Sequence, residues 1–127
     1  MDSCKISRWQ QLKAQLNNLE PEIFVETYLK KPGAVCIDVR TKEEYQSGHL
    51  PGALHLDYLS PRLADLLEAL EQGKTYFIYC RTGRRSLRVC TLMQNMGFKQ
   101  VYNCDNGIKD LDLSKIKIEA GSLQSPK

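Results

Sequence analysis

The chain has 127 residues, enough for one domain that buries about two thirds of its unfolded surface around a single core. With 42% hydrophobic and 26% charged residues, its composition excludes a disordered or fibrous protein. No apolar run approaches the roughly 20 residues that span a bilayer, and the first residues lack the apolar centre of a secretory signal. We therefore expect a cytoplasmic protein that has neither a membrane nor a nucleic acid as a partner.

The net charge of +3 is concentrated in one stretch of the chain. Between Glu71 and Asp105 there is no acidic residue, and the six basic ones are Lys74, Arg81, Arg84, Arg85, Arg88 and Lys99. The rest of the chain has 12 basic and 15 acidic residues, a net charge of −3. A local positive field is therefore expected around Cys80, which lies inside this stretch.

The chain has an odd number of cysteines, five, and no two of them form a C-x-x-C pair: Cys4, Cys36, Cys80, Cys90 and Cys104. Without a secretory context, structural disulfides are not expected. The two histidines, His49 and His55, stand apart from any cysteine pair, and ligands at zinc-finger spacing are missing. We therefore expect no metal site.

The first predicted element is a helix over residues 6–19, in which five apolar side chains recur at helical spacing: Ile6, Trp9, Leu12, Leu16 and Leu19. Such a helix either docks on the domain or forms a dimerising seam, and fewer than three heptads favour docking. Pro21 then restarts the chain in a second helix from Glu22 to Lys30, which the sequence KPG ends.

The next elements form a strand, a short helix and a second strand. The run AVCIDV, residues 34–39, suits a strand buried on both faces of a parallel sheet. Thr41 and Glu44 have the spacing of a capping box, so a short helix is expected to end near Gly48. A turn and a brief strand over residues 53–56 follow.

The second half of the chain repeats this alternation. Ser60 as cap and Pro61 at the first helical position predict a helix that ends before Gly73. A strand over residues 75–79, a helix over residues 86–96 and a strand in QVYN, residues 100–103, come next. This alternation predicts an α/β fold with a mainly parallel sheet. Ligands of such sheets bind beyond the carboxyl ends of strands, where Cys80 follows Tyr79.

The loop after Tyr79 has the composition of an anion site. A strand that runs into a short loop and then a helix turns successive backbone N–H groups inward, and Gly83 permits the tight turn. A cysteine thiolate at the start of such a loop is stabilised by these N–H groups, by the helix end and by nearby guanidinium groups. The alternative is a buried strand-end cysteine beside a solvated arginine face; four arginines within eight residues and no acid favour the thiolate.

Three segments together resemble the single-domain rhodanese-like sulfurtransferases: CIDVRTKEEYQSGHLPGALHL, YFIYCRTGRRS and VYNCDNGIKDL. The resemblance spans residues 20–111 and implies a five-stranded parallel sheet flanked by helices. It divides the chain into a helical extension over residues 1–19, a rhodanese-like domain over residues 20–118 and a flexible tail over residues 119–127. It also implies that Cys80 accepts a sulfane sulfur as a persulfide and passes it to a second nucleophile.

The length of the cysteine loop distinguishes a sulfurtransferase from phosphatases of similar architecture. Dual-specificity phosphatases of similar architecture have an arginine six positions after the cysteine, where this chain has Ser86, and Arg85 comes one residue early. Arg81, directly after the cysteine, resembles the thiosulfate-using enzymes more than the mercaptopyruvate-using ones. A phosphatase or arsenate reductase is therefore the last alternative.

The implied mechanism is covalent catalysis in two halves, without a metal or an organic cofactor. Cys80 attacks the outer sulfur of thiosulfate, the loop from Arg81 to Ser86 holds the sulfonate and the persulfide, and cyanide, a thiol or a protein cysteine accepts the sulfur. The loop residues are Arg81, Thr82, Gly83, Arg84, Arg85 and Ser86. Two alternatives remain: a sulfur-relay partner that uses protein persulfide donors and protein acceptors, and a non-catalytic anion-binding or interaction module.

Several residues outside the loop have supporting roles in this interpretation. Asp38 and Arg40 match the family's D-V-R and are expected to brace the site, with Arg40 paired to Glu43 or Glu44. His49 is expected to be a hydrogen-bonded turn residue rather than a base. Cys90 or Cys104 could resolve an oxidised Cys80 if close enough. Two departures from the family, Asn106 for glycine and Leu111 for tryptophan, lie in the loop after the last strand and leave the acceptor open.

Overall fold

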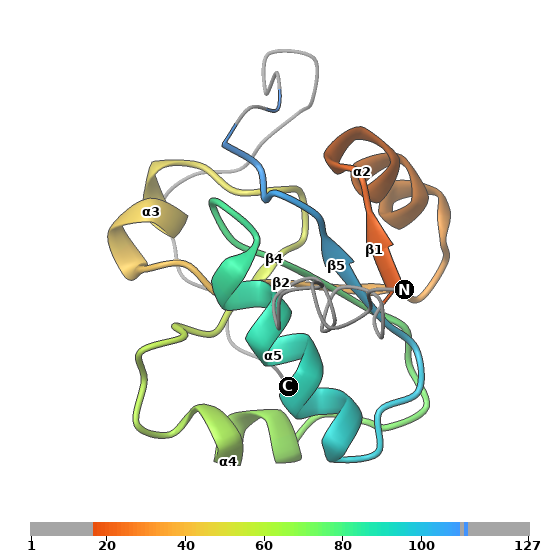
Figure 1. The fold of residues 1–127 in the computed structure, drawn as a ribbon, viewed down its shortest axis with the longest axis vertical. Helices are drawn as coiled ribbons and strands as arrows, with labels where there is room; N and C mark the ends of the chain where they lie inside the picture. The colour runs from red at the N-terminus through yellow and green to blue at the C-terminus, as the bar shows by residue number, and fades with distance from the viewer. Residues whose placement is uncertain (1–16, 110, 112–127) are drawn as a thin grey trace, which may run out of the picture.

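The computed structural model of the chain describes residues 17–109 and 111 (Figure 1). Its elements in chain order are β1 (Asn17–Leu19), α2 (Pro21–Lys30), β2 (Val35–Asp38), α3 (Lys42–Ser47), β3 (Leu54–His55), α4 (Leu63–Glu68), β4 (Tyr76–Tyr79), α5 (Arg84–Asn95) and β5 (Val101–Cys104). The strands form a five-stranded sheet in the order β1-β5-β4-β2-β3. All four neighbouring pairs are parallel, so the predicted α/β fold is confirmed.

The central strand β4 consists entirely of buried residues, Tyr76 to Tyr79, which is why it reads as a continuous apolar run. It pairs with β2 on one side, where Asp38 lies opposite Tyr79, and with β5 on the other. The carboxyl ends of β2 and β4 therefore meet at the same edge of the sheet. This edge carries both the D-V-R segment and Cys80.

Helices cover both faces of the sheet and make two separate hydrophobic clusters. One cluster contains side chains of α4 and α5, such as Leu67, Leu87 and Met93, against Ile37 and Ile78. The other contains Phe24 and Val25 of α2 and Tyr45 of α3, against Phe77 and Tyr79. In Figure 1, α5 crosses in front of the sheet with α4 below it, and α2 lies beside β1. The alternating strand residues thus face different helices.

The prediction of a helix through Leu19 is wrong for its last three residues. Asn17–Leu19 form an edge strand that pairs with Tyr102–Cys104 of β5, and the Asn103 side chain donates a hydrogen bond to Asn18 Oδ1 at 2.8 Å. Pro21 disfavours helical backbone in the residue before it, and Glu20 is accordingly extended. The remainder of that predicted helix, residues 6–16, and the predicted tail, residues 119–127, lie outside the described residues.

The two helices on the α5 side differ from prediction at their ends. Helix α4 begins at Leu63 rather than at Pro61, because the Ser60 hydroxyl accepts the Arg62 N–H within a turn before the helix. It ends at Glu68, well before Gly73. Helix α5 begins at Arg84, two residues earlier than predicted. Within the part of the chain described, no helix is long and apolar enough to cross a membrane.

Candidate active site

The cysteine loop joins β4 to α5 and turns at Gly83, which has a φ of 91° in the left-handed region. Gly83 caps α5, so the backbone N–H of Ser86 belongs to the first helical turn and has no partner within the helix. That N–H points to Cys80 Sγ at 3.4 Å, and the N–H of Gly83 donates to the same sulfur at 3.0 Å. The expected convergence of loop N–H groups on the sulfur is thus present at these two residues.

The Ser86 side chain also contacts the sulfur, a contact not predicted from the sequence. The Cys80 thiol lies 3.4 Å from Ser86 Oγ, whose own hydroxyl donates to the Gly83 carbonyl at 3.2 Å. If the sulfur is ionised, the same hydroxyl can turn and donate to Sγ instead. The signal for this contact was available: a serine in the first turn of α5, directly above the loop.

Cys80 is fully buried, with an exposed fraction of 0%. It packs with Ile78, Leu87 and Cys90 in the cluster beneath α5. Cys80 is therefore buried, as in the alternative of a strand-end cysteine, but its sulfur also accepts two hydrogen bonds. A sulfur donor must displace neighbouring groups before it reaches Sγ.

The arginines of the loop do not all turn towards the sulfur. Arg81, Arg84 and Arg88 are exposed, and Arg88 donates to the Tyr58 hydroxyl at 3.4 Å. Arg85 is partly buried and forms an ion pair of 3.4 Å with Glu44. Arg85 and Arg88, which were expected to stabilise the thiolate, thus make contacts with Glu44 and Tyr58 instead.

Glu44 links α3 to the cysteine loop. Its carboxylate accepts the Thr41 N–H at 3.0 Å and completes the predicted capping box, besides pairing with Arg85. Burial alone would raise the pKa of Glu44, but the Thr41 hydrogen bond and the Arg85 charge outweigh it and lower the pKa below its ordinary value. The carboxylate is thus charged at neutral pH and fixes the guanidinium of Arg85.

Asp38 and Arg40 form a buried ion pair, which corrects the predicted pairing of Arg40 with Glu43 or Glu44. Arg40 Nη2 lies 2.7 Å from Asp38 Oδ2 and also donates to the Gly48 carbonyl at 2.6 Å. Burial opposes the charge of Arg40, but the hydrogen bonds to Asp38 outweigh it and raise the pKa of the guanidinium. The pair forms because Asp38, the last residue of β2, and Arg40, two residues later, turn to the same side, whereas Glu44 pairs with Arg85 of α5.

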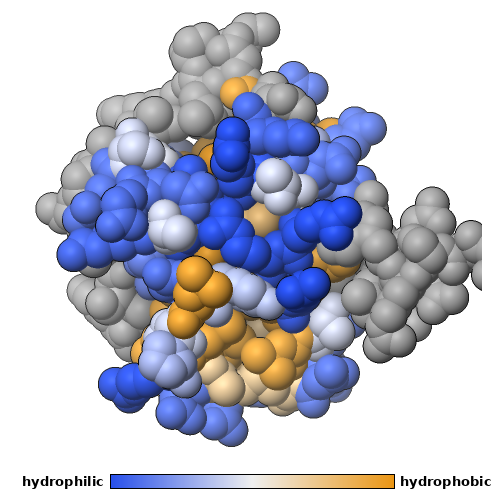
Figure 2. Space-filling view, turned by 60° about the vertical axis from the view of Figure 1, so that its left-hand side comes forward, coloured by the Kyte–Doolittle hydropathy of each residue, from blue (hydrophilic) through white to orange (hydrophobic). Residues whose placement is uncertain are grey.

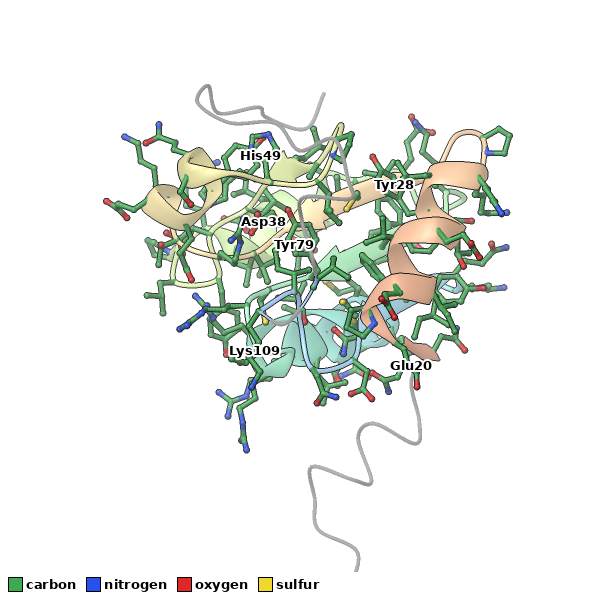
Figure 3. All side chains as sticks on the ribbon, turned by 90° about the horizontal axis from the view of Figure 1, so that it is seen from above. Glu20, Tyr28, Asp38, His49, Tyr79 and Lys109 are labelled. Atoms are coloured by element: carbon green, nitrogen blue, oxygen red, sulfur yellow. The ribbon has the colours of Figure 1, made fainter. Side chains whose placement is uncertain are left out.

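The expectation for His49 agrees with its surroundings. Its Nδ1 lies 2.8 Å from the Tyr45 carbonyl oxygen, and its ring stacks on Tyr45 with 3.7 Å between the centroids. Tyr79 contacts the next residue of this turn, because its hydroxyl accepts the Leu50 N–H at 3.1 Å. Asp38, His49 and Tyr79 are labelled in Figure 3 and lie together on the side of α3. His49 thus fixes the turn between α3 and β3, next to Gly48, whose carbonyl accepts a hydrogen bond from Arg40.

The segment after β5 lies against the outside of the cysteine loop. The N–H groups of Ile108 and Lys109 donate to the carbonyls of Cys80 and Arg81 at 3.1 and 3.0 Å. At Gly107, with a φ of 69°, a Cβ atom would overlap with the Arg81 carbonyl group. Asn106 also has a positive φ, 64°, a conformation that asparagine tolerates. Asn106 therefore adopts the conformation that a glycine would, and Gly107 and Gly83 permit the close approach of the two segments.

The other described cysteines are free and buried: Cys36, Cys90 and Cys104. Burial raises the pKa of all three thiols. Cys90 shares a cluster with Cys80, whereas Cys104 lies in the cluster on the opposite face of the sheet. Among the described residues, no group of three metal-ligating side chains comes together.

Residues 22–113, which contain β2 to β5 and the cysteine loop, match the family model "Rhodanese-like domain". The chain therefore belongs to the rhodanese-like domain family. A crystal structure of a rhodanese-like domain protein from Staphylococcus aureus superposes on it with a TM-score of 0.69. The two have 22% identity, and the match covers 84% of this chain and 100% of the other, which shows the shared fold.

Curated relatives add two named classes of protein. The chain is 33% identical over 81 residues to the thiosulfate sulfurtransferase GlpE of Pseudomonas savastanoi. The match covers 64% of this chain and 74% of that protein. It is 32% identical over 94 residues to the putative sulfur carrier protein YrkF of Bacillus subtilis, covering 71% of this chain and 50% of that protein.

Proposed function

We propose that the protein is a sulfurtransferase of the thiosulfate type that carries sulfur as a persulfide on Cys80. The observation that carries the proposal is the position of Cys80 Sγ, which accepts the N–H groups of Gly83 and Ser86 where β4 meets α5. The similarity to thiosulfate sulfurtransferases supports the reaction class. Catalysis by Cys80 and substrate binding by residues 81–86 are parts of this proposal.

In the first half-reaction, the Cys80 thiolate attacks the outer sulfur of thiosulfate. A new S–S bond forms on Sγ, the S–S bond of thiosulfate breaks, and sulfite leaves with its electron pair. The two N–H groups that point to Sγ, together with the positive end of α5, stabilise the anionic sulfur before and after transfer. Arg81 and Arg84 are both exposed, and their positive charges would attract the sulfonate.

In the second half-reaction, an acceptor attacks the outer sulfur of the persulfide. With cyanide, the new C–S bond gives thiocyanate and the Cys80 thiolate is restored, so charge and atoms balance without a cofactor. A small thiol or a protein cysteine can take the same place. Asp38 and Arg40 act from behind the loop, since their buried ion pair holds Gly48 and the end of β2.

A sulfur-relay role, with protein persulfide donors and protein acceptors, is the second candidate. The similarity to a protein named as a putative sulfur carrier favours it. It uses the same Cys80 persulfide and differs in the molecules that bring and take the sulfur. The expected cytoplasmic location belongs to both versions of the proposal, and the four free cysteines among the described residues agree with it.

The test is turnover of thiosulfate and cyanide to thiocyanate by the wild-type protein and by Cys80→Ser. We expect steady turnover that the substitution abolishes while the fold is retained. Cys36→Ser is a matched control, because it changes a buried cysteine on the other side of the sheet. Thiocyanate formation that survives in Cys80→Ser would overturn the assignment of Cys80.

A further inference from the structure

A fixed turn beside the cysteine loop presents a leucine to solvent. In this turn, residues 57–60, the Asp57 carboxylate accepts the Leu59 N–H at 2.9 Å and the Asp57 carbonyl accepts the Ser60 N–H at 2.9 Å. Leu59 at the tip is 71% exposed, the highest fraction among the large apolar side chains of residues 17–109 and 111. Because apolar surface gains free energy when it leaves water, a leucine held out by an ordered turn offers a contact that a partner can cover.

The Leu59 turn lies at the same edge of the sheet as Cys80. The Tyr58 N–H donates to the Val39 carbonyl at 3.2 Å, and the Val39 N–H donates to the Tyr79 carbonyl at 3.0 Å. The turn, the end of β2 and the cysteine loop are therefore consecutive neighbours. Arg88 of α5 reaches across to the Tyr58 hydroxyl and joins the turn to the helix that begins at the loop.

Exposed basic side chains extend from this turn to the mouth of the loop. Arg88 and Arg84 are one helical turn apart on α5, and Arg81 precedes them in the loop. Lys109, which is also exposed, lies beside Arg81, because its backbone N–H donates to the Arg81 carbonyl. Figure 2 shows apolar side chains bordered by strongly hydrophilic ones on one face of the molecule. Asp57, the acid nearest in sequence to Leu59, already accepts the Leu59 N–H.

We propose that Leu59, Arg88, Arg84 and Arg81, together the Leu59–Arg88 face, dock an acidic protein that brings the accepting thiol to Cys80. The inference rests on the proposed function and names its acceptor class. Acidic side chains of the partner would lie along the arginines, and an apolar side chain would pack on Leu59. Because Cys80 is buried, the accepting cysteine must stand on a flexible segment that can enter the loop.

The transfer step is a thiol–persulfide exchange. The acceptor thiolate attacks the outer sulfur of the Cys80 persulfide, the new S–S bond forms on the acceptor, and Cys80 Sγ leaves with the electron pair of the old bond. The acceptor becomes the persulfide, and Cys80 returns to the thiolate. No oxidant or reductant is needed.

Two synthetic peptides test this face directly. Both contain one cysteine and one leucine; glutamates fill the remaining positions in the first, and lysines in the second. The protein is loaded with thiosulfate, each peptide is added, and the persulfidated peptide is measured by mass, with thiocyanate formation measured in parallel. Binding is measured separately by fluorescence anisotropy with cysteine-to-serine peptides, so that it does not depend on loading.

We expect the acidic peptide to bind and accept sulfur at least about tenfold better than the basic one at low salt, with the difference shrinking as salt screens the charges. Leu59→Ser and Arg88→Gln should each lower binding and transfer to the acidic peptide by about two- to fivefold, the range of an exposed charge or apolar contact. Both variants should form thiocyanate at the wild-type rate.

Ile23→Ser and Lys99→Gln are the matched controls, because Ile23 is 48% exposed on α2 and Lys99 is exposed beyond the far end of α5. Equal binding of the two peptides, or losses in Leu59→Ser and Arg88→Gln no larger than in these controls, would overturn the docking face. Selective binding without any sulfur loading would instead contradict the proposed function and leave the docking face standing.

Discussion

Gly107→Ala tests how closely the segment after β5 must approach the cysteine loop. An alanine at a φ of 69° is in the left-handed region, which costs about 1–2 kcal/mol. Its Cβ would also overlap with the Arg81 carbonyl group and the Thr82 nitrogen, which are backbone atoms and cannot rotate away. Displacing these backbone atoms should cost about a further 1–3 kcal/mol.

Gly33→Ala is the matched control for this substitution. Gly33 has a φ of 76°, and a Cβ there would meet no atom within 4 Å, so the variant has the conformational cost without the overlap. The two variants should therefore differ by about 1–3 kcal/mol in the free energy of unfolding. At about 4 °C per kcal/mol for a domain of this size, Gly107→Ala should melt about 4–12 °C below Gly33→Ala.

The assay is thermal unfolding followed by circular dichroism, with thiocyanate formation measured on the folded variants. We expect Gly107→Ala to lose turnover as well as stability, since the displaced peptide belongs to the loop around Cys80 Sγ. Gly33→Ala should keep the wild-type turnover. Equal melting temperatures and equal turnover in the two variants would refute the reasoning, because the contact with Arg81 would then make no demand on residue 107.

Three further predictions follow from the site. Iodoacetamide should modify Cys80 before Cys36, Cys90 and Cys104 in a Cys4→Ser protein near neutral pH, because two backbone N–H groups point to the Cys80 sulfur, whereas burial raises the pKa of the other three thiols; peptide mass mapping that finds Cys36 modified as fast as Cys80 would count against an activated Cys80. Ser86→Ala should slow sulfur loading about fivefold or more through loss of a hydrogen bond of about 1 kcal/mol to the sulfur, whereas Thr91→Val, which removes a hydroxyl bonded to the Leu87 carbonyl, should load normally. Glu44→Gln should lower the melting temperature most at neutral pH, because the folded-state pKa of Glu44 is depressed and the stabilising effect of its charge is lost as the pH falls through that value. Melting curves of the variant and the wild type between pH 7 and about pH 3 that differ by a constant amount would contradict this.

The parts of the fold that depend on local patterns were predictable from the sequence. The apolar runs at β2 and β4 and the capping box at Thr41 and Glu44 are present as expected. Residues 17–19 were not, because a three-residue edge strand is specified by its pairing with β5, about 85 residues away, rather than by its own pattern. The helical spacing of Leu16 and Leu19 misled the prediction, although Pro21 marked a break.

The same distinction applies to the site. The strand before Cys80 and the turn at Gly83 could be predicted from adjacent residues, because a strand, a tight turn and a helix start are local events. The contacts of Arg85 with Glu44 and of Gly107 with Arg81 join segments far apart in the chain. The burial of Cys80 also depends on this tertiary packing, whereas the basic residues around it in the sequence suggested an exposed cysteine.

The measurement that tests the central proposal most directly is the mass of the intact protein after a single exposure to thiosulfate, followed by mapping of the modified peptide. The proposal predicts one added sulfur atom, located on Cys80 and removed by cyanide. A folded protein that gains no sulfur, or one that holds it on another cysteine, would contradict it.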